Sequence, residues 1–362
     1  MPNEAEGITP NNRIAYLDDL RVLAIAAVVI LHISIQGWSE ADVNSTSWMF
    51  LNIWNSMVRW SVPVFVMISG ALFLNPKRKV TVYHLWSKKI PRILTAFLFW
   101  SVIYALYNYL TRSNWSLHTF LMAILTGYYH MWFLFMIIGL YLVTPLMRKI
   151  AEDRRMLNYF LVLSMIFGFL IPTIRHQILP FSLALSESDT INALLKDYDA
   201  MRLYLPLGYT GYFALGYYLY KRNLTPTERA VIYGLGILGF VITIVTTAVI
   251  SRNLGKANSA NYEFVSLNVL MESVAVFVLV RYRSSHWNGK IRNLLERLNG
   301  KTFGIYLIHL LFVDAMADLL GIKATLFAPI VSVPLLATVA FALSTLCIKG
   351  IQKLGRFSKY IC

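Results

Sequence analysis

The stretch LRVLAIAAVVILHISIQGWS, residues 20–39, decides the fold of this chain. It carries a single charged side chain, Arg21, in 20 residues. An α-helix of roughly 20 apolar residues spans the hydrocarbon core of a bilayer, which is about 30 Å thick. The stretch therefore predicts a transmembrane helix.

The same pattern recurs along the rest of the sequence. Stretches almost free of Asp, Glu, Lys and Arg predict nine more helices, near residues 55–75, 93–111, 119–147, 156–174, 203–220, 230–251, 264–280, 302–320 and 324–348. The stretch 119–147 is too long for one upright helix and leaves room for a re-entrant or interfacial piece before His130. We expect an all-α integral membrane protein, a bundle of about ten transmembrane helices.

Composition supports a membrane protein. Hydrophobic residues make up 57% of the chain and charged residues 14%, against about 25% charged in a soluble domain. Mean hydropathy is +0.57. The net charge of +15 would suggest nucleic acid in a soluble protein, but no aromatic-rich basic surface accompanies it. Two cysteines, Cys347 and Cys362, are too few for a disulfide framework.

The distribution of basic residues predicts the orientation. If the N-terminus is cytoplasmic, the inner segments hold 25 of the 33 Lys and Arg residues. This excess follows the positive-inside rule, so both termini are expected in the cytoplasm. The N-terminus has no basic n-region, so the first helix is expected to be retained. We expect cytoplasmic tails at 1–15 and 349–362 on either side of a transmembrane domain at 16–348.

The first helix carries the most informative pattern. Arg21 and His32 are eleven positions apart, which in an α-helix is about three turns plus 20° and about 16 Å of axial rise. They therefore share a face, and Asp18, one turn before Arg21, lies near it. An ionisable side chain at the membrane depth of His32 is costly, and a functional site is the default interpretation. The alternative is a hydrogen bond that holds helices together.

A basic segment precedes the third predicted helix. Lys89 and Arg92 have the i, i+3 spacing that places side chains on one helix face. With Arg21 they would form a basic mouth for a phosphorylated ligand that enters from the cytoplasm. Ordinary positive-inside anchoring is the alternative explanation for both residues.

Two clusters combine aromatic residues with histidine: Tyr129-His130-Met131-Trp132-Phe133 and Gly304-Ile305-Tyr306-Leu307-Ile308-His309. Trp and Tyr usually form belts at the membrane boundary, but His309 lies too deep in its helix for that. Further charges at membrane depth are Arg59, Glu272, Asp314 and Asp318, the last two interpreted as headgroup-boundary residues. No Walker-type loop, HExxH motif or CxxC pair occurs, and we expect no metal and no nucleic-acid partner.

Together these residues resemble the bacterial membrane acyltransferase-3 family. The resemblance rests on Leu17-Asp18-x-Leu20-Arg21 with His32, Ser61-Val62-Pro63-Val64-Phe65-x-Met67-Ile68-Ser69-Gly70, Tyr129-His130-x-Trp132-Phe133, and Gly304-Ile305-Tyr306 with His309. The motifs occur in the family's order along nearly the whole chain. Within the family the chain is most similar to the short members that O-acetylate enterobacterial common antigen, which lack an appended soluble domain.

The resemblance implies a multi-pass enzyme of the bacterial inner membrane. Such an enzyme would move an acetyl group from cytoplasmic acetyl-CoA to a hydroxyl of a cell-envelope glycan or its lipid-linked precursor. Arg21 and His32 correspond to the family's central pair. The family's basic motif at the third helix appears here as Lys89-x-x-Arg92, and lysine cannot offer the bidentate fork of arginine to a phosphate.

The expected roles follow from this implied reaction. His32 is the general base or the transient acetyl carrier, Arg21 with Lys89 and Arg92 holds the CoA phosphates, and Asp18 orients Arg21. Pocket-shaping candidates are His130, Trp132, Tyr306 and His309. The alternatives are a polysaccharide exporter or transporter that uses intramembrane His and Asp residues, a structural partner of an envelope-assembly complex, and succinyl in place of acetyl.

Overall fold

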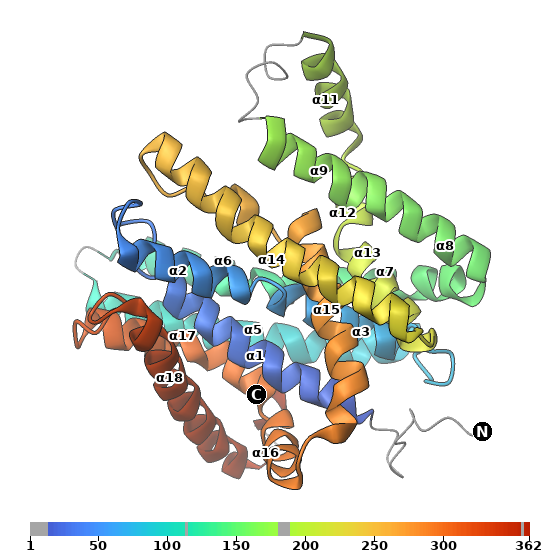
Figure 1. Cartoon of the computed structure of the whole chain (residues 1–362). Helices are drawn as coiled ribbons and strands as arrows, with labels where there is room; N and C mark the ends of the chain where they lie inside the picture. The colour runs from blue at the N-terminus through green and yellow to red at the C-terminus, as the bar shows by residue number, and fades with distance from the viewer. Residues whose placement is uncertain (1–13, 113–114, 180–188, 356–357) are drawn as a thin grey trace.

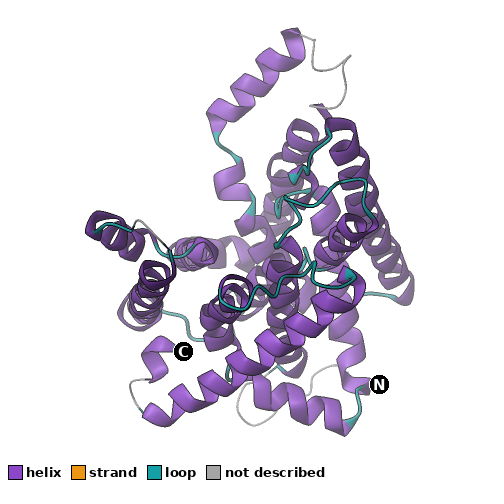
Figure 2. Cartoon of the chain, turned by 90° about the vertical axis from the view of Figure 1, so that its left-hand side faces the viewer, coloured by secondary structure: helices purple, strands orange, loops and turns teal. Residues whose placement is uncertain are grey.

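The computed structural model describes residues 14–112, 115–179, 189–355 and 358–362 of the 362-residue chain. Most of the expected N-terminal tail at 1–15 lies outside these residues. Figure 2 shows helices and loops, and no strand is found among the described residues. The helices are α1 (Ala15–Ile35), α2 (Thr46–Met57), α3 (Ser61–Phe73), α4 (Val82–His84), α5 (Ile90–Thr111), α6 (Leu117–Thr126), α7 (Trp132–Glu152), α8 (Arg154–Leu163), α9 (Ile171–Thr173), α11 (Asp189–Met201), α12 (Tyr204–Leu207), α13 (Tyr209–Lys221), α14 (Pro226–Leu254), α15 (Leu267–Arg283), α16 (Gly289–Asn299), α17 (Thr302–Asp318), α18 (Pro329–Ile351) and α19 (Ser358–Ile361).

Each of the ten stretches predicted from the sequence overlaps helical structure. Within the described residues, seven helical segments are long and apolar enough to cross a membrane, and α16 with α17, bent by 80°, would add an eighth. The other two predicted spans are α1, which carries Asp18, Asp19 and Arg21 near its start, and α13, which has 13 residues. The all-α membrane fold is therefore as predicted.

Helix α1 occupies the middle of the bundle (Figure 1). It contacts α2, α3, α15, α16, α17 and α18. Its side chains are buried on nearly all sides, including Leu20, Ala24 and Ile25, each with no exposed surface. A helix that is apolar all round is buried among other helices, and α1 has this pattern. The two ends of α1 are therefore fixed by the neighbours that surround it.

Glycine allows α3 and α13 to pack backbone to backbone. A Cβ at Gly70 of α3 would lie 1.7 Å from the carbonyl oxygen of Phe213, and one at Gly216 of α13 would lie 2.0 Å from the carbonyl oxygen of Met67. No other residue fits at such distances. Small residues at helix crossings are characteristic of membrane bundles, where close backbone approach replaces the hydrophobic effect as the source of attraction.

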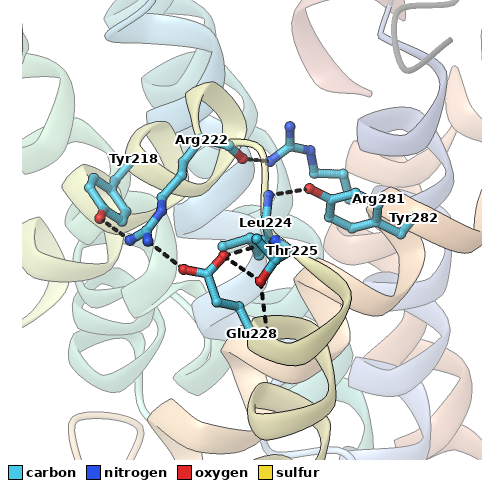
Figure 3. Close-up of polar contacts among 7 residues, drawn as sticks. All are labelled: Tyr218, Arg222, Leu224, Thr225, Glu228, Arg281 and Tyr282. Atoms are coloured by element: carbon cyan, nitrogen blue, oxygen red, sulfur yellow. Dashed lines mark hydrogen bonds and ion pairs between the residues drawn. The ribbon is translucent and has the colours of Figure 1, made fainter. Parts of the chain in front are cut away.

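The turn between α13 and α14 is held by polar contacts (Figure 3). Thr225 and Glu228 form a capping box at the start of α14. Arg222 donates to the Tyr218 hydroxyl at 2.5 Å and forms an ion pair with Glu228. Arg281, at the end of α15, donates to the carbonyl oxygen of Arg222 at 2.6 Å. These contacts join the turn to the end of α15.

The long predicted stretch 119–147 is interrupted before His130. Gly127 ends α6 with a φ of +74°, a left-handed conformation that favours glycine. A short 3₁₀ turn, Tyr129–Met131, follows and leads into α7. The interruption places His130 at a turn between two helices.

Candidate active site

Three histidines from distant parts of the chain meet beside the end of α1. His32 comes from α1, His130 from the turn before α7, and His309 from the middle of α17. The ring centroids are 5.2 Å apart for His32 and His309, 5.5 Å for His130 and His309, and 6.4 Å for His32 and His130. His130 is 3% exposed and His309 is fully buried. The sequence singled out all three residues, and the structure brings them together.

Hydrogen bonds orient the cluster. Nδ1 of His309 lies 2.7 Å from the carbonyl oxygen of Tyr306. Because a carbonyl only accepts, Nδ1 carries the proton, and in the neutral ring Nε2 is the unprotonated nitrogen. Among the described residues, this Nε2 has no hydrogen-bond partner. The Tyr306 hydroxyl donates to the carbonyl oxygen of His130 at 2.7 Å, which ties α17 to the turn before α7. The buried cluster thus contains a free imidazole acceptor.

His32 faces a tyrosine and a cavity. Its Nδ1 lies 3.4 Å from the Tyr129 hydroxyl. The cavity has a volume of about 230 Å³, smaller than the roughly 300–1,000 Å³ of sites that enclose a whole small ligand. It therefore suits reacting groups better than an entire nucleotide. Its polar and aromatic lining is His32, Arg59, Phe65, Tyr129, His130, Trp132, Phe133, Phe264 and Tyr306.

Arg59 is the charged cavity residue that the sequence did not assign to the site. The sequence marked it as a charge at membrane depth but gave it no role. It lies in the turn between α2 and α3, two residues before Ser61 of the Ser61-Val62-Pro63 motif, and is 6% exposed. A buried arginine next to that motif was the available signal, but nothing in the sequence placed it beside His32.

Aromatic rings form one wall of the cavity. Trp132 stacks on Phe264 with a centroid distance of 6.0 Å and an interplanar angle of 27°. Trp132 also lies 5.9 Å from the Tyr209 ring and is 40% exposed. A partly exposed indole at a cavity offers an apolar face and an N–H donor.

The opposite end of α1 carries the predicted basic cluster. Asp18 forms an ion pair with Arg21 at 2.8 Å. Arg21 and Arg92 both lie close enough to Lys89 to repel its charge. Arg92 is exposed and donates one hydrogen bond to the carbonyl oxygen of Cys362 at 2.9 Å. The structure therefore brings Arg21, Lys89 and Arg92 into one region.

The two clusters are linked by a continuous helix. α1 is unbroken from Ala15 to Ile35, so the Cα atoms of Arg21 and His32 are separated by about 16 Å along its axis. Arg21 of the charged cluster and His32 of the histidine cluster thus lie at fixed positions on one helix.

The acidic residues of α17 accept hydrogen bonds from tyrosine hydroxyls. Asp314 accepts from Tyr128 at 2.8 Å, and Asp318 accepts from Tyr107 at 3.2 Å. Elsewhere in the bundle, buried Glu272 accepts from Thr243 at 2.8 Å. Within the described ranges, no group of three or more His, Cys, Asp or Glu residues is arranged to hold a metal ion.

Comparison with known proteins identifies a family for this chain. A family model with the description "acyltransferase domain", that of the acyltransferase-3 family, matches residues 14–349. The chain is 21% identical over 307 residues to the "probable poly-beta-1,6-N-acetyl-D-glucosamine export protein" of Staphylococcus aureus strain MSSA476, and equally to that of strain N315. The alignment covers 82% of this chain and 81% of the relative. No solved structure gives a significant match.

Proposed function

The chain belongs to the acyltransferase-3 family and is a multi-pass membrane acyltransferase, and on this premise we propose that it O-acetylates a cell-envelope glycan or its lipid-linked precursor with acetyl-CoA as donor. The observation that carries the proposal is the meeting of His32, His130 and His309 near one end of α1, whose other end holds Arg21. His32 and His130 line the cavity there.

The basic cluster supports the choice of a CoA donor. Arg21, Lys89 and Arg92 together offer several N–H donors and three positive charges, which suit the phosphates of CoA. The hydrogen bond from Arg21 to Asp18 holds the guanidinium in place. The axial separation of about 16 Å from Arg21 to His32 is comparable to an extended pantetheine arm. CoA held at the basic cluster would present its thioester near His32.

The histidine cluster supports the chemistry. In the proposed reaction His32 removes the proton from the acceptor hydroxyl, or takes the acetyl group transiently itself. His130 and Tyr306 line the cavity beside it. The His309 ring lies against the His32 ring. Its unprotonated Nε2 has no hydrogen-bond partner among the described residues. Burial of the cluster keeps water from competing with the acceptor for the acetyl group.

A glycan acceptor is supported by the family and by the cavity wall. The relatives are named as probable export proteins of poly-beta-1,6-N-acetyl-D-glucosamine, so their name concerns an exported polysaccharide. The stacked Trp132 and Phe264 offer an apolar face to a sugar ring. Enterobacterial common antigen is the acceptor that we propose for this chain.

The proposed location is the bacterial inner membrane with both termini in the cytoplasm. Its support is the placement of 25 of the 33 basic residues in the inner connections. This topology puts the basic end of α1, with Arg21, on the side where acetyl-CoA is made.

The test uses purified protein in liposomes. Incubation with acetyl-CoA and an envelope glycan extract, followed by mass spectrometry of the glycans, should reveal added acetyl groups. Succinyl-CoA in a parallel reaction tests the choice of acyl group. Absence of acyl transfer by folded protein from either donor would contradict the proposal.

Export is the second candidate, favoured by the printed name of the staphylococcal relatives. An exporter would move polymer across the liposome membrane without consuming acetyl-CoA, and its rate would depend on an ion or polymer gradient. Polymer movement with no acetyl transfer would favour export over the proposed reaction.

A further inference from the structure

Arg59 is a buried cation without a carboxylate partner at ion-pair distance among the described residues. Nη1 donates to the carbonyl oxygen of Tyr262 at 3.3 Å, and Nη2 donates to Oδ1 of Asn55. The guanidinium carbon lies 4.1 Å from the centre of the Tyr262 ring. These contacts hold the group rigidly, but none of them neutralises its charge.

Burying an arginine in this way is costly. An ion that is removed from water loses several kcal/mol of hydration, and a nearby anion normally offsets that loss. The Nε of Arg59 is buried and has no hydrogen-bond partner among the described residues. Glu263 and Glu272 attract the guanidinium only from beyond ion-pair distance. The side chain therefore has no anion in direct contact and retains an unused donor.

The location of Arg59 indicates where an anion would bind. Arg59 and His32 line the same cavity of about 230 Å³. Of the thirteen residues that line it, Arg59 is the one with a permanent charge. Its guanidinium lies close enough to His32 for the two groups to interact electrostatically. A negative charge that forms in this cavity would thus have a cation and an imidazole beside it.

We infer that Arg59 binds the oxyanion that forms on the acetyl carbonyl during transfer. The inference rests on the proposed function and extends it to a second catalytic residue. The acceptor hydroxyl oxygen bonds to the thioester carbonyl carbon, and its proton passes to the imidazole of His32. The carbonyl π electrons move to the oxygen, and the resulting oxyanion accepts hydrogen bonds from Arg59.

Collapse of this intermediate completes the step. The oxyanion electrons re-form the C=O bond, the C–S bond breaks, and the thiolate of CoA takes the proton from the His32 imidazolium. The products are the acetyl ester and CoA thiol. No other reactant is required.

The charges of Arg59 and protonated His32 favour an oxyanion in this cavity. Proton transfer makes His32 cationic, and Arg59 would repel that charge. An oxyanion that forms in the same step lies between the two cations and attracts both. A fixed guanidinium can do this without reorganising during the reaction, which is how electrostatic stabilisation lowers a barrier.

The alternative is that Arg59 only cross-links the α2–α3 turn to the segment before α15 through Asn55 and Tyr262. A cross-link affects folding and stability, whereas an oxyanion donor affects kcat and leaves substrate KM nearly unchanged. The kinetic constants therefore separate the two roles.

The test measures kcat and the KM for acetyl-CoA in liposomes, with the glycan extract as acceptor. Arg59→Gln should lower kcat by about 10²- to 10³-fold, the usual effect of losing one oxyanion donor, with KM within about threefold of wild type. Added guanidinium ion should restore part of the turnover of Arg59→Ala. Arg252→Gln is the control, because Arg252 donates to the carbonyl oxygen of Val43 outside the cavity, and it should keep wild-type kcat and gain nothing from guanidinium.

Near-wild-type kcat in folded Arg59→Gln would overturn the inference, and so would a raised KM with unchanged kcat. If the glutamine variant fails to fold, Arg59→Lys decides: it keeps the charge and loses the planar fork. A kcat lowered tenfold or more at unchanged KM supports the inference, and a wild-type kcat overturns it. A fully active His32→Gln would instead contradict the proposed function, whatever the Arg59 variants do.

Discussion

The ring of His309, on α17, lies 5.2 Å from the ring of His32, on α1, and its Nδ1 is fixed as a donor by the carbonyl oxygen of Tyr306. The unprotonated Nε2 of His309 is therefore a free acceptor within the cluster. In the proposed reaction it can accept a hydrogen bond from His32 when that ring becomes protonated. His309 then stabilises the charged form of the base.

Replacing His309 with phenylalanine tests this relationship. An aromatic ring is kept and the acceptor is lost. A hydrogen bond to a charged group is worth about 1.5–3 kcal/mol, so kcat should fall by about 10- to 100-fold. Acetyl-CoA binding, measured by titration calorimetry, should stay near the wild-type value. Unchanged kcat in folded His309→Phe protein would show that His309 only fills space.

The role proposed for the basic cluster predicts an effect on acetyl-CoA binding. Arg92→Ala should weaken acetyl-CoA binding by about 10- to 100-fold, because it removes a charged donor to the ligand's phosphates. The effect on maximal turnover should be smaller. Lys88→Ala is the matched control, since Lys88 is an exposed cation on the same segment with no assigned role. Equal acetyl-CoA affinities for the two variants would identify Arg92 as a membrane anchor.

The crossing of α3 and α13 predicts an effect on stability. Gly70→Ala would place a methyl group 1.7 Å from the carbonyl oxygen of Phe213. Forcing the helices apart should cost about 1–3 kcal/mol or more, and the thermal midpoint in detergent should fall. Gly139→Ala is the control, because a Cβ there meets nothing within 4 Å. Gly139→Ala should match or slightly exceed wild type. Equal midpoints for the two variants would contradict the close packing at Gly70.

Orientation in the membrane can be tested with fusions. Alkaline phosphatase, which is active only outside the cytoplasm, should be inactive when fused after Cys362 and active when fused after Lys256. The second position lies in the outer connection between the predicted helices 230–251 and 264–280. An active fusion at Cys362 would reverse the proposed topology and the side from which acetyl-CoA enters.

The sequence predicted those parts of the fold that depend on local pattern. Apolar stretches of sufficient length located the helices, because a bilayer selects on length and hydrophobicity alone. The pairing of Asp18 with Arg21 followed from i, i+3 spacing within one helix. The break before His130 was anticipated because the stretch 119–147 exceeds one span.

Packing between helices could not be predicted in the same way. The sequence identified His32, His130 and His309 separately, but the spacing within a helix does not say which helices become neighbours. The position of Arg59 beside His32 could not be predicted for a related reason. The turn between α2 and α3 interrupts one long apolar segment, Thr46–Phe73, without Gly or Pro between the helices. The contact of α19 with α5, made by Trp100 and the carbonyl oxygen of Ile361, also depends on tertiary structure.

Glycan acetylation by His32→Gln protein tests the central claim most directly. An amide can keep a structural hydrogen bond but cannot accept the proton at neutral pH. Turnover by the purified, folded variant should therefore fall by about 10²- to 10⁴-fold, the usual contribution of general acid–base catalysis. Acetyl-CoA binding should persist, since the basic cluster lies about 16 Å away along α1. Near-wild-type acetylation by folded His32→Gln would contradict the mechanism.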